Sequence, residues 1–199
     1  MSDITAAGAR TESAATNAGL FFRRWLANPL QMGSIIPSSR TLCRHIASHV
    51  RLKDDEVVVE LGAGTGVVTR AMLAAGIPAE RIVVFEIVPE MAEHLRRVFP
   101  GVNVICGDAF ELERDLPARF RGRVGDAICG IPLVMLPLAQ QQRFVDAVEA
   151  VAPGRGFLLL TYCITSPLPY RKLGLSADRK VWTPVNFPPA SVWRYQPVG

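Results

Sequence analysis

The residues with the clearest chemical potential are a carboxylate and three glycines in the run Val57-Val58-Val59-Glu60-Leu61-Gly62-Ala63-Gly64-Thr65-Gly66. A β-branched strand, a glycine-rich turn and a helix start in that order let the backbone approach a bound cofactor closely. The spacing is E-x-G-x-G-x-G rather than G-x-G-x-x-G, and no Gly-Lys-Ser/Thr follows, so a P-loop is excluded. Taken alone, the run is also compatible with an ordinary glycine-rich turn.

Glu60 stands at the end of the expected strand, just before the first glycine. A carboxylate there favours a ligand with a positive group over a pyrophosphate. S-adenosylmethionine, which carries an ammonium and a sulfonium, fits that demand. We therefore expect cofactor contacts from Glu60 and from the turn residues Gly62, Ala63, Gly64 and Gly66.

Two further carboxylates follow the next two apolar runs. Glu86 lies 20 positions after Gly66, where a carboxylate can accept hydrogen bonds from both ribose hydroxyls. Asp108 can accept from an adenine amine, and Phe110 can flank the ring. Each carboxylate alone is more often a helix cap or a solvated loop residue, but three at successive strand ends favour a cofactor site. The neighbouring residues assigned to this site are Ile87 and Ala109.

The apolar patterns alternate between strand and helix periods, which predicts a mostly parallel sheet covered on both faces. With the cofactor motifs, this resembles a class I methyltransferase: an α/β, Rossmann-like fold with a mostly parallel seven-stranded sheet, a C-terminal antiparallel hairpin and an N-terminal helical extension. The expected strands are 57–61, 81–86, 102–106, 124–129 and 156–163, with a hairpin near 180–186 and 191–195; the expected helices are 17–30, 38–50, 67–75, 89–98 and 138–151.

Methyl transfer is an in-line displacement that requires an aligned nucleophile and exclusion of water. The methyl acceptor should therefore lie where the fourth strand meets the cofactor. Adenine N6-methyltransferases place an N-P-P-Y or N-L-P-Y tetrad there, whereas this chain reads Gly130-Ile131-Pro132-Leu133, without the amide or the aromatic ring that would hold a flipped base. The backbone carbonyls at Gly130 and Ile131 can still receive an amine, and Gly130 leaves room for one that grows with each methyl. A turn forced by glycine and proline is an equally valid description of the same residues.

Other segments resemble the soluble bacterial phospholipid N-methyltransferases, and the resemblance covers about residues 20 to 196. The segments that carry it are Phe22-Arg23-Arg24-Trp25-Leu26, Asn28-Pro29, Gly33-Ser34-Ile35-Ile36-Pro37-Ser38-Ser39, the Gly130–Leu133 turn, Thr161-Tyr162, Ser166-Pro167-Leu168-Pro169 and Asn186-Phe187-Pro188-Pro189-Ala190.

This resemblance implies methylation of phosphatidylethanolamine towards phosphatidylcholine, with S-adenosylmethionine as donor. It also implies cofactor contacts from Ser34 and Ser38, and an acceptor site of Gly130, Ile131, Pro132 and Tyr162. Tyr162 can contact the amine or simply fill the core. Similar enzymes methylate other amino lipids such as ornithine lipids, and an rRNA or DNA adenine N6-methyltransferase is the alternative outside lipids. The domain boundaries expected are 1–37 for the membrane-contacting extension and 38–199 for the methyltransferase domain.

The charge distribution points to an anionic partner. Residues 1–53 carry a net charge of +5, residues 54–154 carry −6 and residues 155–199 carry +5. We expect Phe21, Phe22, Trp25 and Leu26 to enter an anionic phospholipid surface, with Arg23 and Arg24 towards the headgroups. A helix packed on the domain, and basic residues that merely decorate solvated faces, remain alternatives.

Chain length, cysteine spacing and the lack of long apolar runs argue against a zinc or disulfide-bonded protein and against a membrane-spanning one. The 199 residues suit one domain with a substantial core. Four scattered cysteines lack C-x-x-C spacing, which favours buried free thiols over zinc or disulfides, and we expect no metal. The N-terminus does not read as a signal peptide, and no apolar run approaches the roughly 18 residues of a spanning helix. We expect a cytoplasmic enzyme peripherally associated with the inner membrane, with nucleic acid an unlikely partner.

Overall fold

Short β-branched and apolar runs form the centre of the sheet. Val57–Leu61 (β1), Ile82–Glu86 (β2), Val124–Cys129 (β4) and Phe157–Thr161 (β5) are buried along nearly their whole length. Parallel strands that are covered on both faces require such continuous apolar runs. The computed structural model describes residues 40–161, 166–183 and 190–199. The chain divides into two units, residues 1–36 and 37–199, and the described residues all lie in the second.

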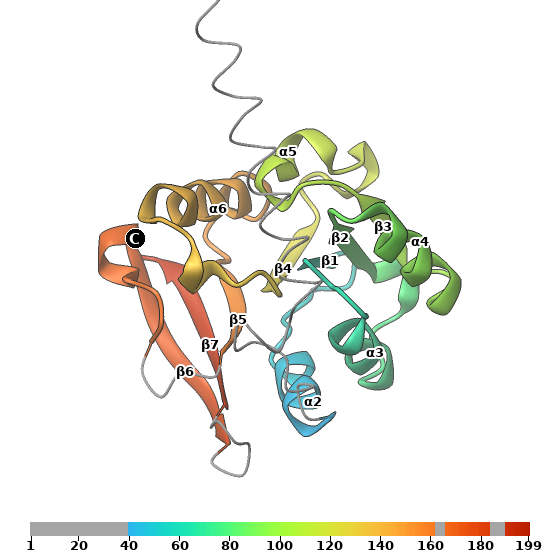
Figure 1. The fold of residues 1–199 in the computed structure, drawn as a ribbon, viewed down its shortest axis with the longest axis horizontal. Coiled ribbons are helices and arrows are strands. Elements are labelled where there is room, and N and C mark those ends of the chain that lie inside the picture. Colours follow the sequence, from blue (N-terminus) through green and yellow to red (C-terminus); the bar gives the residue numbers. More distant parts are fainter. Residues whose placement is uncertain (1–39, 162–165, 184–189) are drawn as a thin grey trace, which may run out of the picture. The chain divides into compact units, whose positions relative to one another are not determined.

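Three further strands complete a seven-stranded sheet: Asn103–Cys106 (β3), Leu175–Thr183 (β6) and Ala190–Pro197 (β7). The strand order is β3-β2-β1-β4-β5-β7-β6 (Figure 1). Strands β1 to β5 are mutually parallel, whereas β7 runs antiparallel to both β5 and β6. The chain therefore builds outward from β1 in one direction and resumes at β4 in the other, which creates a switch point between these two strands.

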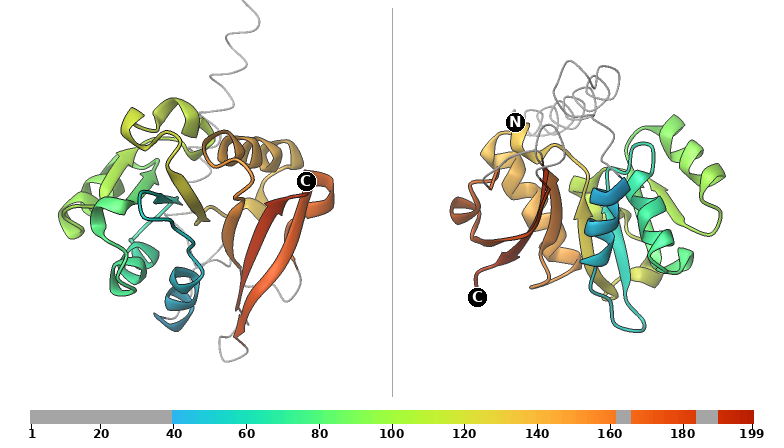
Figure 2. Two further views of the ribbon diagram at one scale, coloured as in Figure 1. Left: turned by 180° about the vertical axis from the view of Figure 1, so that it is seen from behind. Right: turned by 90° about the horizontal axis from the view of Figure 1, so that it is seen from below.

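Helices cover both faces of this sheet (Figures 1 and 2). Arg40–Ser48 (α2), Val67–Ala74 (α3) and Pro89–Val98 (α4) contribute to one apolar core with the strands. On the opposite face lie Leu112–Asp115 (α5) and Leu138–Val151 (α6). There Phe144 of α6 meets Phe157 of β5 edge to face, with ring centroids 5.3 Å apart. The two cores hold the strand ends at fixed positions.

A buried ion pair fixes the hairpin to the parallel strands. The Arg194 guanidinium on β7 donates two hydrogen bonds to the Asp126 carboxylate on β4, at 3.0 and 2.8 Å. Arg194 also donates to the His49 carbonyl (2.7 Å), and Asp126 accepts from the Arg51 N–H (2.9 Å). A buried pair of this kind is strongly destabilising when one partner is lost, because the other charge stays buried. The pair thus ties β7 and the end of α2 to β4.

The fold matches the sequence prediction in its seven strands, its parallel centre and its closing hairpin. The predicted start of the hairpin was wrong, since β6 begins at Leu175 rather than near residue 180. This strand lies at the edge of the sheet and alternates buried Leu175 with polar residues such as Ser176 and Asp178, so it lacks the continuous apolar run of a central strand. Part of the predicted hairpin, residues 184–186, lies outside the described residues.

The thiols are only partly as predicted. Cys43 and Cys129 are buried and free, as expected, but Cys106 is exposed because it ends β3, the other edge strand. Cys163 lies outside the described residues. The short helix α5 was not predicted, since four residues are too few to show a helical period. In the described part of the chain, no helix has the length and apolarity needed to span a membrane.

Candidate active site

The carboxyl ends of β1, β2 and β4 meet at the switch point of the sheet, where doubly wound folds bind their ligands. Leu61 pairs in register with Phe85 on one side and with Cys129 on the other. Beyond the strands, the Gly62 N–H donates to the Phe85 carbonyl and the Gly130 N–H donates to the Leu61 carbonyl, both at 2.8 Å. These bonds join the glycine turn to β2 and to the turn that follows β4.

The glycines of the first turn have distinct roles. Gly66, at the start of α3, has φ of 75°, and a Cβ there would overlap the Phe99 ring and lie 2.8 Å from a Leu95 methyl carbon. Gly64 has φ of 56°, and nothing lies within 4 Å of its Cβ position. Gly66 is therefore demanded by packing against α4, whereas Gly64 leaves open space where a ligand can approach the backbone. Ala63 is buried in the core, so only its backbone can contribute to a site.

Glu86 ends β2 directly beside this turn. One carboxylate oxygen accepts from the Gly64 N–H (2.9 Å) and the other from the Val88 N–H (3.0 Å). Each oxygen keeps a further lone pair, which is what two ribose hydroxyls need. Burial raises the pKa of Glu86, and its backbone hydrogen bonds oppose that rise. Ile87, which lies between Glu86 and Val88 in the sequence, is half-buried.

Glu60 is buried and turned towards α3. Its carboxylate accepts from the Thr69 hydroxyl at 2.5 Å. Burial raises its pKa to about 7, the Thr69 hydrogen bonds oppose that rise, and the nearby negative charge of Glu86 adds to it. The site therefore holds two neighbouring carboxylates that a cationic ligand would favour in their charged forms.

The sequence allowed two roles for Asp108, a helix cap and an adenine contact, and in the structure it is a helix cap. Its Oδ1 accepts from the Phe110 N–H (2.9 Å) and caps the short helix η2 (Ala109–Glu111). Burial raises the pKa of Asp108. Its Oδ2 accepts no hydrogen bond within the described part of the chain, so one carboxylate oxygen stays available for a ligand amine. Ala109 is buried beneath the turn.

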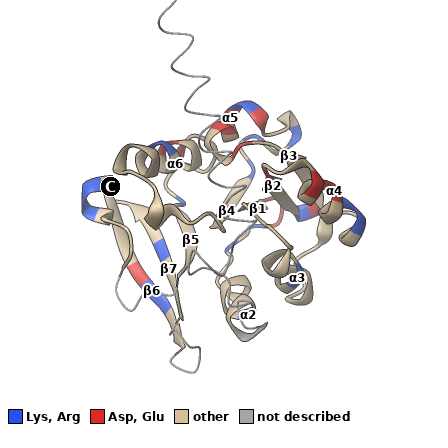
Figure 3. Ribbon diagram, viewed as in Figure 1, with Lys and Arg blue, Asp and Glu red and all other residues tan. Residues whose placement is uncertain are grey.

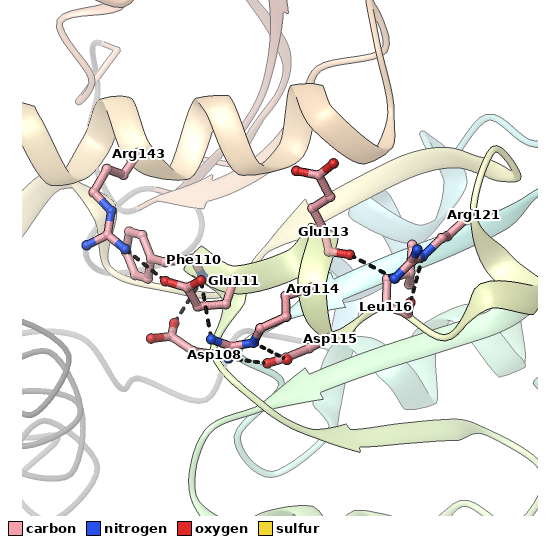
Figure 4. A network of polar contacts seen from close by, with 9 residues as sticks. All are labelled: Asp108, Phe110, Glu111, Glu113, Arg114, Asp115, Leu116, Arg121 and Arg143. Carbon is pink, nitrogen blue, oxygen red and sulfur yellow. Dashed lines mark hydrogen bonds and ion pairs between the residues drawn. The ribbon is translucent and has the colours of Figure 1, made fainter. Parts of the chain in front are cut away.

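Phe110 is held by two residues of α6, as Figure 4 shows for Arg143. The Arg143 guanidinium lies 5.8 Å from the Phe110 ring centroid and pairs with Glu111 at 3.1 Å. Phe144 also meets the Phe110 ring edge to face, with centroids 6.1 Å apart. A ring held in this way can serve as a rigid flank for a planar base.

The turn after β4 differs from the expectation in two respects. A Cβ at Gly130 would overlap the Gly62 carbonyl oxygen, so the prediction that Gly130 leaves room for a growing amine was wrong. The Ile131 carbonyl accepts from the Leu133 N–H (2.8 Å) and from the Cys129 thiol (3.4 Å), which occupies both lone pairs. The exposed Gly130 has a carbonyl that accepts no hydrogen bond from any described residue. Pro132 follows, half-buried, with its own carbonyl bonded to the Met135 N–H (3.0 Å).

Three side chains matter to this geometry that the sequence patterns did not indicate. Thr69 holds Glu60, Arg143 covers Phe110, and Gln141 donates to the Leu133 carbonyl (3.1 Å). Thr69 is buried in the first turn of α3, three residues after Gly66, so its position relative to the glycines was a usable signal. Arg143 and Gln141 are 35 and 33 residues after Asp108, and no local pattern connects them to it.

Other predicted site residues lie outside the described residues. These are Ser34, Ser38 and Tyr162, together with the expected amphipathic helix 17–30. Among the residues that the structure does describe, no group of three or more His, Cys, Asp or Glu could hold a metal ion.

Comparison with known proteins supports the class of this site. Residues 58–154 match a family model described as a methyltransferase domain. Over 178 residues the chain is 28% identical to an ornithine lipid N-methyltransferase of Singulisphaera acidiphila, and the match covers 87% of this chain and 93% of the relative. The mycinamicin-resistance protein MyrB of Micromonospora griseorubida is 37% identical over 79 residues, or 39% of this chain and 24% of that protein.

Solved structures confirm the predicted fold class. The crystal structure of 1,6-didemethyltoxoflavin-N1-methyltransferase from Burkholderia thailandensis, which contains S-adenosylhomocysteine, superimposes with a TM-score of 0.64 at 14% identity. The match covers 100% of this chain and 93% of that one. At such low identity the likeness establishes the fold alone.

Proposed function

The chain is a class I S-adenosylmethionine-dependent methyltransferase, and on this premise we propose that it methylates the amino group of a membrane lipid. The observation that carries the proposal is the turn after β4. There the exposed Gly130 has a carbonyl that accepts no hydrogen bond from the described residues, and the Gly130–Leu133 turn contains neither asparagine nor an aromatic residue. An aliphatic amine needs only a hydrogen-bond acceptor there, whereas a flipped base needs stacking and a side-chain amide.

The cofactor would lie along the ends of β1, β2 and β3. Its amino acid part approaches the backbone at Gly64, where the space is open. Glu86 accepts from the ribose hydroxyls through the two lone pairs left by its backbone bonds. Glu60 supplies negative charge behind the turn, and the adenine lies between Asp108 and the Phe110 ring. Side chains would thus contact the ribose and the adenine, and the backbone of the glycine turn would contact the amino acid part.

The methyl acceptor would be held on the other side of the switch point. In the first two transfers the Gly130 carbonyl accepts a hydrogen bond from the lipid amine and orients its lone pair towards the methyl group; the dimethylated amine has no N–H left to donate in the third. Before attack the ammonium loses a proton to water or to Tyr162. The nitrogen lone pair then forms the new N–C bond while the S–C bond breaks, and S-adenosylhomocysteine leaves with the bonding electron pair. Because the amine attacks in line with the departing sulfur, its orientation by Gly130 governs the rate.

Two lipids are candidates for the substrate. Phosphatidylethanolamine follows from the sequence resemblance described above, and ornithine lipid follows from the name of the relative that matches most of both chains. Both present a primary amine at the end of a headgroup, and only phosphatidylethanolamine carries a phosphodiester. The exposed Arg171 and Lys172 would suit that phosphate. We favour phosphatidylethanolamine, with its product phosphatidylcholine after three methyl transfers.

The reaction would take place at the inner surface of the bacterial membrane. An N-terminal amphipathic helix with Phe21, Phe22, Trp25 and Leu26 would enter the bilayer, and Arg23 and Arg24 would contact anionic headgroups. This remains a prediction from the sequence, as does the domain boundary at residue 37.

Radiolabelled S-adenosylmethionine tests the proposal directly. The purified chain is incubated with vesicles that contain phosphatidylethanolamine, with vesicles that contain ornithine lipid, and with RNA, and the label is followed after lipid extraction and thin-layer chromatography. We expect label in mono-, di- and trimethylated phosphatidylethanolamine. Label in ornithine lipid alone would change the substrate but keep the amino-lipid class. Label in RNA, or in neither lipid while the chain still binds the cofactor, would overturn the proposal.

A further inference from the structure

The segment that follows the acceptor turn is exposed and apolar. The short helix η4 (Leu133–Met135) leads into α6, and Val134, Met135 and Leu138 are 42%, 42% and 44% exposed. In the described part of the chain these are three of the seven large apolar side chains with substantial exposure. Pro137 and Ala139 between and beside them are exposed as well. Exposed apolar residues that are contiguous in this way mark an interaction surface more often than scattered ones do.

The same segment carries no charge. No Lys, Arg, Asp or Glu occurs from residue 127 to residue 142. Figure 3 accordingly shows the connection between β4 and α6 without acidic or basic residues, while α4 and α5 carry both. Protein interfaces usually surround an apolar centre with a polar or charged rim. An uncharged projection fits the interior edge of a lipid layer better than it fits a protein partner.

Part of the backbone of this segment is hydrogen-bonded locally. The Pro132, Leu133 and Leu136 carbonyls accept from the Met135 N–H (3.0 Å), the Leu136 N–H (3.0 Å) and the buried Gln141 amide (2.9 Å). Gln141 also donates to the Leu133 carbonyl at 3.1 Å, and the prolines at 132 and 137 have no N–H to satisfy. Hydrocarbon offers no hydrogen bonds, so a segment that enters it must pair its backbone internally.

The segment is also anchored rather than loose. Leu133 is buried in the core between the exposed positions and the acceptor turn, and Gln141 is buried one turn into α6. The exposed side chains therefore project from a fixed base. Val134 is only four positions beyond Gly130, so whatever contacts this surface lies next to the methyl acceptor.

We propose that Val134, Met135 and Leu138, the acceptor-side apolar surface, dock onto the hydrocarbon edge of a lipid bilayer and hold the acyl chains of the substrate beside the Gly130 carbonyl. The inference rests on the proposed lipid amine methylation and adds where the lipid is held. It differs from the predicted N-terminal helix in position and in character, because it lacks basic residues and should act independently of lipid charge.

The test uses the full chain with a polar double substitution, Met135→Ser with Leu138→Ser. Its matched control is Val98→Ser with Val198→Ser, which removes two exposed apolar side chains elsewhere, on α4 and at the C-terminus. Binding to neutral phosphatidylcholine vesicles is measured by flotation at high salt, which screens the arginines of the N-terminal helix. Cofactor affinity is measured by calorimetric titration, and methyl transfer is measured with long-chain phosphatidylethanolamine in vesicles and with a water-soluble short-chain analogue.

We expect the Met135/Leu138 variant to lose vesicle binding and vesicle activity about 10- to 100-fold, since partial burial of two apolar side chains is lost. Its cofactor affinity and its activity on the short-chain analogue should stay within about twofold of the control. Unchanged vesicle binding would overturn the proposal, as would an equal loss on both substrates, which would place these side chains in the acceptor site itself. Vesicle binding is measured without any reaction, so it tests this surface even in a chain that methylates no lipid at all.

Discussion

The two sides of the switch point present different polar groups to a ligand. At the ends of β1, β2 and β3, three carboxylates are held by neighbouring hydrogen-bond donors. At the end of β4, no charged side chain occurs from residue 127 to residue 142, and the available polar group is the Gly130 carbonyl. Under the proposed function, a cofactor with two cationic groups and several hydroxyls would meet mainly side chains. A small amine on a lipid would meet backbone and an apolar surround.

Substitutions in the glycine turn should change stability the most. They also distinguish Gly66, which is required for packing, from Gly64, which is expected to contact the cofactor. Gly66→Ala should lower the free energy of unfolding by roughly 3–5 kcal/mol, because strain at a positive φ adds to an overlap with Phe99 and Leu95. Gly64→Ala has similar strain but no overlap, so it should cost only about 1–2 kcal/mol. Urea denaturation followed by circular dichroism measures both.

Gly64→Ala should nevertheless lose most of its affinity for S-adenosylmethionine, because the methyl group fills the open space at the turn. Calorimetric titration of the folded variant decides this. A Gly64→Ala variant that binds the cofactor normally would show that the ligand does not approach the turn there.

Glu86→Ala should weaken cofactor binding by about 2–4 kcal/mol, since two charge-assisted hydrogen bonds to the ribose are lost. The substitution also frees the Gly64 and Val88 N–H groups, so the comparison needs the unfolding free energy of the same variant. Unchanged affinity in a folded variant would remove Glu86 from the site. The control is Glu90→Ala, an exposed carboxylate in the first turn of α4.

These residues also show how far the sequence could be read. Glu60 and Glu86 lie at the ends of apolar strands and Asp108 follows one. Parallel strands bring their carboxyl ends together, so the grouping of the carboxylates was predictable. The acceptor turn gave no such signal. Whether a carbonyl is free depends on partners such as Leu133 and Cys129, and the steric role of Gly130 depends on a turn 68 residues away in the sequence.

The buried Glu60 should make both stability and cofactor binding depend on pH. Its pKa rises from 4.5 to about 7 in the fold, so the fold favours the neutral acid. The stabilisation from this group is complete below pH 4.5 and is lost as the pH rises to about 7. At about pH 8, Glu60→Gln should therefore raise the free energy of unfolding by roughly 2–3 kcal/mol while it keeps an acceptor for Thr69.

The negative charge of ionised Glu60 should also strengthen binding of the cationic cofactor. Wild-type affinity for S-adenosylmethionine should increase between about pH 6 and pH 8 as Glu60 ionises, and Glu60→Gln should flatten that profile. Glu93→Gln, an exposed change on α4, is the control. A variant that keeps the steep profile would assign the pH dependence to another group.

Gly130→Ala tests whether the two sides are as separate as their chemistry suggests. The new methyl group would overlap the Gly62 carbonyl, so an acceptor-side substitution should disturb the cofactor turn, at about 1–3 kcal/mol of stability. Cofactor affinity should then fall together with methyl transfer. Ile131→Val, a smaller change at the next residue, should leave cofactor affinity intact. Normal cofactor binding by folded Gly130→Ala would mean that the two turns adjust independently.

Substitution of Arg143 should have the smallest effect. It tests whether one helix, α6, contributes residues to both the acceptor side and the cofactor side. Helix α6 begins with the exposed Leu138 of the acceptor-side apolar surface, and five residues later Arg143 lies over the Phe110 ring and pairs with Glu111. Exposed ion pairs contribute about 0–1 kcal/mol, so Arg143→Ala should barely change the free energy of unfolding.

Cofactor affinity of Arg143→Ala should fall about two- to fivefold, because Phe110 loses one of the two groups that hold its ring. The matched control is Arg114→Ala, which also removes a partner of Glu111 but leaves the guanidinium over the Phe110 ring in place, and it should bind the cofactor as the wild type does. Titration calorimetry with S-adenosylhomocysteine resolves a difference of this size. If Arg143→Ala slows transfer to lipid while cofactor affinity stays constant, the whole of α6 belongs to the acceptor side, and the division drawn at Arg143 is wrong.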